Sequence, residues 1–310
     1  MTTIRRAATL VLAALLGALG TWFLGLLSPS GTIGASPAGD PLRVVATNGV
    51  LADLAAQVGG SRVQVTSLVP AGSDPHTWEP SPRDAQAIAT ADVIIYNGLG
   101  LEPWLPRLLQ GAAQPATAVI QLAEGIEPIA GLHFDVHNHE EGNPHLWLDV
   151  TRAMHYVRRI ENALIEADPQ GARHYRALAR AYLDELEELD RWFQEQVSQI
   201  PPERRVLVTY HDAFAYMARR YGFEVAGVLV PSPDREPAAS NMVHLVQLLR
   251  ERRIPAVFVE PQIDPAVAQA LAREAGVRVA VLYTDSLTAD VPTYVAMMRA
   301  NARALVEALR

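Results

Sequence analysis

The stretch "HFDVHNHEEGNPHLWLD" at residues 133–149 contains a concentration of side chains that could do chemistry. It places His133, His137, His139 and His145 within thirteen positions, among acidic residues. Imidazole nitrogens and carboxylate oxygens are ligands for divalent transition metals such as zinc. Three interpretations fit this stretch: it is a complete metal site in one loop, it is a solvated polar loop, or it supplies one part of a site spread along the chain.

The sequence pattern predicts an α/β fold for the elements that must position these residues. From residue 42 onward, short runs rich in β-branched residues alternate with helical patterns, which is typical of parallel sheets with helices on their faces. The predicted strands are 43–48, 63–69, 92–98 and 117–123 in the first half, and 205–211, 224–230, 256–261 and 278–284 in the second. The predicted helices are 49–59, 81–90, 102–110, one starting near residue 149, 212–221, 238–253, 264–275 and 291–309.

One long helix is expected between the two halves. After Pro169 no proline interrupts the sequence before Pro201. Apolar residues recur there at spacings of three and four, at Tyr175, Leu178, Tyr182, Leu186, Leu189, Phe193 and Val197. About thirty helical residues would extend roughly 45 Å. We therefore predict an N-terminal lobe at 40–168 and a C-terminal lobe at 201–310, each a parallel sheet flanked by helices, joined by a rigid helix at 169–200.

Polar side chains follow the ends of several predicted strands, where ligands gather in open parallel sheets. These are His76, His211, Glu260 and Asp285, and His145 lies just before a predicted helix. Three imidazoles and one carboxylate form a ligand set that suits zinc, and that manganese tolerates if the carboxylate binds through both oxygens. The spacing alone does not establish a site, because ordinary hydrogen bonds satisfy most single histidines at strand ends.

The composition limits the chemistry and the compartment. The 310-residue chain has no cysteine, so disulfides and thiolate ligands are excluded and any metal site must use nitrogen and oxygen. Its formal charge of −8 argues against a nucleic-acid partner. Arg5 and Arg6 precede an apolar run at 7–27, so residues 1–39 are expected to be a signal peptide, or a membrane anchor, plus a linker. The working part is then expected outside the cytoplasm.

Several motifs resemble, in order and spacing, the zinc/manganese substrate-binding proteins of bacterial ABC importers, the cluster A-I or periplasmic metal-binding family. They are "DPHTWEPSPRD", "NPHLWLD", "VTYHDAFAYMARRYG", "VPSPDREPAASNM", "FVEPQ" and "LYTDSL", and the resemblance covers residues 42–310. It implies a periplasmic binding fold of two α/β lobes and a rigid connecting helix. It also implies that His76, His145, His211 and Asp285 are the metal ligands.

The third ligand position bears on the choice of metal. Family members thought to prefer manganese often hold glutamate there, so His211 implies the zinc-type or mixed-metal subgroup. Imidazole is a softer donor than carboxylate, which favours zinc without excluding manganese. Exported relatives are often anchored through a cysteine after the signal. This chain has none, which implies either a soluble periplasmic protein or one held by residues 7–27.

The resemblance implies binding rather than catalysis: capture of Zn²⁺ or Mn²⁺ and delivery to an ABC permease with its ATPase. We expect a monomer that binds no nucleic acid. One alternative is a zinc-dependent hydrolase with Glu260 as general base, but four protein ligands leave no open position for water, and there is no "HExxH". Another is a binding protein for a chelate such as a siderophore or haem, which predicts an aromatic or arginine-lined cleft with far fewer histidines.

Two groups of residues have open roles. Glu260 either accepts the N–H of a ligand histidine or pairs with an arginine. The loop of His133, His137 and His139 is either simply solvated or a weak zinc-collecting loop that passes the ion to the buried site.

Overall fold

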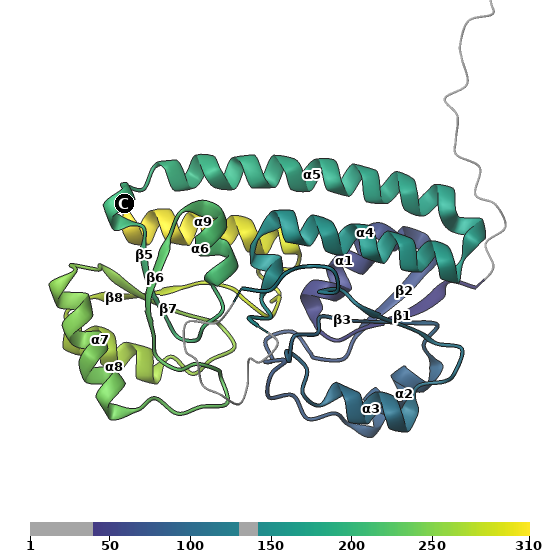
Figure 1. Ribbon diagram of the computed structural model, residues 1–310, viewed down its shortest axis with the longest axis horizontal. Coiled ribbons are helices and arrows are strands. Elements are labelled where there is room, and N and C mark those ends of the chain that lie inside the picture. The colour runs from purple at the N-terminus through teal and green to yellow at the C-terminus, as the bar shows by residue number, and fades with distance from the viewer. Residues whose placement is uncertain (1–39, 130–141) are drawn as a thin grey trace, which may run out of the picture. The chain divides into compact units, whose positions relative to one another are not determined.

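Two parallel sheets of four strands each form the framework of the described residues, which are 40–129 and 142–310 of the computed structural model (Figure 1). The first sheet has the order β2-β1-β3-β4 and the second β6-β5-β7-β8, so both halves have the same topology. The strands are β1 (Leu42–Ala46), β2 (Val63–Ser67), β3 (Val93–Tyr96), β4 (Ala118–Gln121), β5 (Val206–Thr209), β6 (Glu224–Val228), β7 (Ala256–Val259) and β8 (Arg278–Val281).

Helices cover both faces of each sheet (Figure 1). They are α1 (Gly49–Gly59), α2 (Pro82–Thr90), α3 (Leu105–Ala112), α4 (Val150–Ala167), α5 (Ala172–Ser198), α6 (Ala215–Tyr221), α7 (Ala239–Glu251), α8 (Ala266–Ala275) and α9 (Tyr294–Leu309). Local signals set several of their starts. The Asn48 side chain accepts the N–H of Leu51 at the start of α1, and Ser81 forms a capping box with Asp84 at the start of α2.

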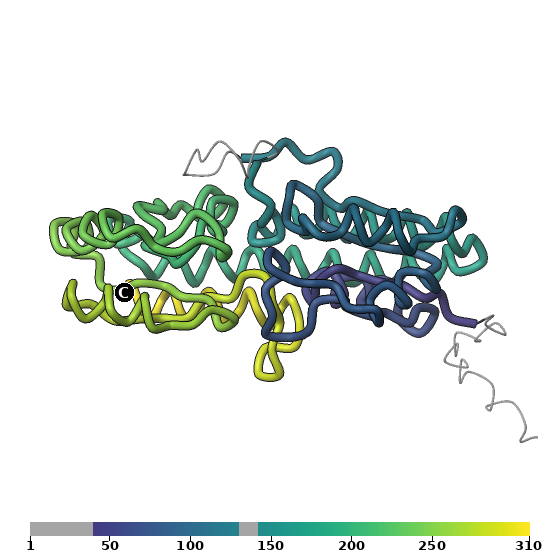
Figure 2. Tube along the Cα trace, turned by 90° about the horizontal axis from the view of Figure 1, so that it is seen from below, coloured from purple at the N-terminus to yellow at the C-terminus, as the bar shows by residue number. Residues whose placement is uncertain are grey.

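The long helix α5 connects the two halves in sequence and packs against α1, α4 and α9. Figures 1 and 2 show it running alongside helices of both halves. Its buried stripe follows the predicted spacing, except that Leu178 is half-buried and Ala179 takes a fully buried place. One hydrophobic cluster joins side chains of α5 to both sheets, including Val44 of β1 and Phe258 of β7. The predicted fold class, two α/β lobes joined by a long helix, is confirmed.

Some predictions fall on residues outside the described ranges. These are the signal or anchor at 1–39, with its apolar run at 7–27, and the loop histidines His133, His137 and His139. Among residues 40–129 and 142–310, no helix has the length and apolar character needed to cross a membrane.

Candidate metal centre

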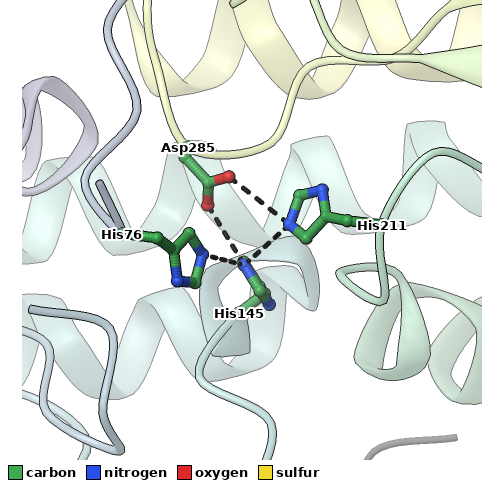
Figure 3. A group of neighbouring side chains, drawn as sticks. All are labelled: His76, His145, His211 and Asp285. Atoms are coloured by element: carbon green, nitrogen blue, oxygen red, sulfur yellow. Dashed lines mark hydrogen bonds and ion pairs between the residues drawn. The ribbon is translucent and has the colours of Figure 1, made fainter. Parts of the chain in front are cut away.

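The four predicted ligands come from four segments that the fold brings to one place (Figure 3). His76 lies in the loop after β2, and His211 comes two residues after β5. Asp285 follows β8, and His145 immediately precedes a short 3₁₀ turn at Leu146–Leu148 that leads into α4. Three of them therefore follow parallel strands, which is where side chains of an open sheet can converge on a ligand.

The donor atoms of the four side chains crowd around the His145 imidazole. Its Nε2 atom lies 3.1 Å from His76 Nε2, 3.2 Å from His211 Nε2 and 3.3 Å from Asp285 Oδ1. All four donor atoms lie within 4.8 Å of one another. Donors bonded to one tetrahedral zinc at about 2.0–2.1 Å are roughly 3.3 Å apart. The spacing therefore fits a single small cation at the centre of the group.

The carboxylate of Asp285 is held in its ionised form. Burial alone would raise its pKa, but the adjacent His145, followed by His211 and His76, lowers it well below the usual range. Thr284 Oγ1 donates a hydrogen bond to Asp285 Oδ2 at 2.9 Å. The other oxygen, Oδ1, is buried and has no hydrogen-bond partner. An ionised, buried oxygen that lies 3.3 Å from the His145 imidazole and accepts no hydrogen bond is a donor suited to a cation.

Glu260 lies against His211, one of the predicted ligands, so the contact agrees with the first of its two predicted roles. Its Oε1 atom is 2.9 Å from His211 Nδ1, and both side chains are buried. The contact turns His211 Nε2 towards the other donors. Burial lowers the pKa of His211, but the negative charges of Glu260, Asp285 and Asp74 raise it by more, to about 9.

Two residues near the centre were missed by the sequence reasoning, Asp74 and Asn143. Asp74 Oδ1 accepts the backbone N–H of His76 at 2.8 Å, and Asn143 Oδ1 accepts that of His145 at 3.1 Å. Burial, followed by the charge of Asp285, raises the pKa of Asp74 to about 6. The signal was present in the sequence. Both residues stand two places before a ligand histidine, in "DPH" and "NPH", where Asp and Asn commonly form side-chain turns.

Comparison with known proteins places this chain in a family. A family model described as zinc-uptake complex component A, periplasmic (ZnuA), matches residues 44–308. The chain belongs to the ZnuA family. It is 35% identical over 280 residues to the manganese-binding lipoprotein MntA of Halalkalibacterium halodurans, a match that covers 89% of this chain and 91% of that relative.

Solved structures in this group share the fold. The periplasmic zinc-binding protein TroA of Treponema pallidum superposes with a TM-score of 0.79 at 31% identity, over 87% of this chain and 99% of that one. The Mn-bound periplasmic metal-binding protein of Candidatus Liberibacter asiaticus gives a TM-score of 0.78 at 31% identity, over 86% and 99% of the two chains.

Membership of the ZnuA family settles the general function. The chain is a metal-binding substrate-binding protein of an ABC transporter, and it acts outside the cytoplasm. It is a binding protein and not an enzyme, and the family works with a permease and its ATPase. The hydrolase and the chelate-binding protein are therefore not favoured.

Proposed function

We propose that this chain captures a divalent transition metal with high affinity, zinc in preference to manganese, and delivers it to its permease. The ion would bind Nε2 of His76, His145 and His211 and the carboxylate of Asp285. The observation that carries the proposal is the position of His145 Nε2, 3.1–3.3 Å from three other donor atoms. One N–H can serve only one of these contacts well, whereas a cation serves all four donors together.

The donor set supports zinc as the preferred ion. Three imidazole nitrogens and one carboxylate are softer in sum than a set with two carboxylates, and zinc accepts four such ligands in a tetrahedron. The printed names of the relatives do not decide the point, because they include manganese-binding MntA and zinc-binding TroA. The preference therefore rests on His211.

Replacing His211 with glutamate is expected to move the preference towards manganese by roughly tenfold or more, a change of about 1.4 kcal/mol in relative binding free energy. The substitution is made in a Glu260→Gln background, because a new carboxylate beside Glu260 would otherwise suffer like-charge repulsion. The Glu260→Gln single variant is the matched control. Competitive titration of Zn²⁺ against Mn²⁺ measures the ratio of affinities, and an unchanged ratio would contradict the assigned role of His211.

Domain roles, assembly and anchoring complete the proposal. Residues 40–168 and 201–310 act as two lobes joined by 169–200, and engagement by the permease shifts them enough to break the ligand set. The protein acts as a monomer. In support, only three large apolar side chains of the described residues are exposed, Val119, Val243 and Val281, and they lie on three different elements.

The N-terminus and the histidine-rich loop have proposed roles that rest on sequence alone. Residues 1–39 export the chain or hold it at the membrane through 7–27, as the apolar run after two arginines indicates. His133, His137 and His139 collect zinc weakly and pass it to the centre, as their number and acidic surroundings suggest.

A further inference from the structure

The side chain of Asn143 is buried and makes polar contacts on both ends of its amide. Its Oδ1 atom accepts the backbone N–H of His145 at 3.1 Å and lies 3.0 Å from His145 Nδ1. Its Nδ2 atom donates to the backbone carbonyl of Asp212 at 2.7 Å. Asn143 therefore touches one ligand histidine directly and the residue next to another, His211.

These contacts determine which way the amide points. The carbonyl of Asp212 can only accept a hydrogen bond, so it must face the NH₂ group. The backbone N–H of His145 can only donate, so it must face Oδ1. The same oxygen faces His145 Nδ1, which must then carry the ring proton. In the neutral ring the lone pair is consequently on Nε2, the atom that faces the other three donors.

The amide also crosses between the two halves of the fold. Asn143 precedes α4, which packs against β3 and β4 of the first sheet, whereas Asp212 follows β5 of the second sheet. The Asn143–Pro144 backbone is held from both sides as well. Tyr216 of α6 donates to Asn143 O at 2.7 Å, and Asn97, directly after β3, donates to Pro144 O at 2.9 Å.

We propose that Asn143 is a positioning residue for His145. It makes the form of His145 that can bind a metal, with the proton on Nδ1 and the lone pair on Nε2, depend on contact between the two halves. While Asp212 O holds Nδ2, the amide cannot turn, and His145 presents its Nε2 lone pair to the ion. If the halves separate, Nδ2 loses its acceptor and the amide becomes free to rotate. The same movement that draws His211 away would then also end the fixed presentation of His145. This inference rests on the proposed metal site and adds a route by which separation of the halves lowers affinity.

The "DPH" turn provides a comparison within the same chain. Asp74 accepts the backbone N–H of His76 as Asn143 accepts that of His145. An ionised carboxylate, however, has only acceptors and cannot donate to a carbonyl across the interface. Of these two turn residues, only the asparagine can both accept the N–H groups of the following histidine and donate to a carbonyl across the interface. Asn143→Asp keeps the acceptor and removes the donor.

The test uses the full chain with three variants: Asn143→Ala, Asn143→Asp and, as a matched control, Asn241→Ala. The Asn241 amide also donates to backbone carbonyls, those of Val228 and Leu229 at 2.9 Å, but it contacts no ligand histidine. The readouts are the ring-nitrogen NMR signals of His145 in the metal-free protein, hydrogen exchange across residues 209–215, and Zn²⁺ affinity by competitive titration.

Asn143→Ala is expected to lose the protonated-Nδ1 signature of His145, to exchange faster at 209–215, and to bind zinc about 10–100-fold more weakly, the usual cost of removing such a ligand-orienting partner. Asn143→Asp is expected to keep the signature, because an acceptor remains, but to exchange faster. Asn241→Ala is expected to change neither the signature nor the affinity.

An unchanged signature and an affinity within twofold of wild type in Asn143→Ala would overturn the proposal, as would loss of the signature in Asn143→Asp. If Asn143→Ala does not fold, Asn143→Asp still tests both the orientation of His145 and the bond to the Asp212 carbonyl. Unchanged hydrogen exchange at 209–215 in Asn143→Asp would contradict the proposed bond between the halves. Failure of the metal site itself looks different. It would appear as wild-type protein that does not bind zinc, while the His145 signature in the metal-free protein would still report on Asn143.

Discussion

Replacing His211 with alanine lowers the affinity for zinc, and the expected loss is more than about 100-fold, because removing a ligand should exceed the 10–100-fold typical of losing a group that merely orients one. The variant leaves two imidazoles and Asp285 around the ion, with a water in place of the third imidazole. It also leaves the carboxylate of Glu260 buried without its partner, which is expected to lower the stability of the folded protein. Competitive titration against a chelator of known affinity measures the change.

His139→Ala is the contrasting variant for this prediction. His139 belongs to the histidine-rich stretch and is not one of the four proposed ligands, so its loss should change zinc affinity by less than about twofold. Equal losses in the two variants would show that the four-ligand centre is not where zinc binds. Thermal unfolding of both metal-free proteins checks that any difference in affinity does not come from misfolding.

The strands and helices were predictable because their signals are local. The run 43–48 overlaps β1 from its second residue onward, the run 224–230 contains β6, and the helix predicted at 49–59 has the bounds of α1. The predicted strands extend two or three residues past the observed ones at the carboxyl end. The reason is that the apolar run continues past the last paired residue, as at 205–211, where β5 ends at Thr209 and the chain then turns to carry His211.

The site was predictable only in part from the residues. Their positions at strand ends made His76, His211, Glu260 and Asp285 candidates. The sequence pattern does not show that segments about 70 residues apart meet in space, and that step came from the resemblance to a family. His145 was harder still, because it precedes a helix instead of following a strand. The turns that Asp74 and Asn143 make with the histidines two places on are local, but the bond from Asn143 to the Asp212 carbonyl crosses the fold, and the sequence does not show that contact.

The same limit applies to the contact between Glu260 and His211. In the sequence, a glutamate at the end of a strand looks the same whether its side chain contacts an imidazole or an arginine in the fold. Tertiary packing decides, and here it buries the carboxylate 2.9 Å from His211 Nδ1. That pairing has a consequence for pH that composition could not have suggested, since the pKa of His211 rises to about 9 instead of falling with burial.

Acidification is expected to weaken zinc binding by about tenfold per pH unit between pH 9 and pH 7, from His211 alone. In the metal-free protein its pKa of about 9 means that the ring is protonated at neutral pH, and zinc must displace that proton. Asp285 adds nothing in this range because its pKa is well below its ordinary value.

The stability of the metal-free protein depends on pH in the opposite direction. The folded pKa lies above the ordinary value of about 6.5, so the stabilisation from protonated His211 is complete below about pH 6.5 and lost as pH rises through 9.

Glu260→Gln separates this mechanism from general acid sensitivity. Glutamine still accepts the Nδ1–H of His211 but lacks the charge that does most to raise the pKa of His211. Titration calorimetry at pH 8 in buffers of different ionisation enthalpy should find close to one proton released per zinc bound by the wild type, and clearly less by the variant. The steep fall in affinity should also begin at a lower pH in Glu260→Gln. Identical proton release in the two proteins, or a wild-type affinity that stays flat from pH 9 to pH 7, would show that the His211–Glu260 pair does not control metal binding.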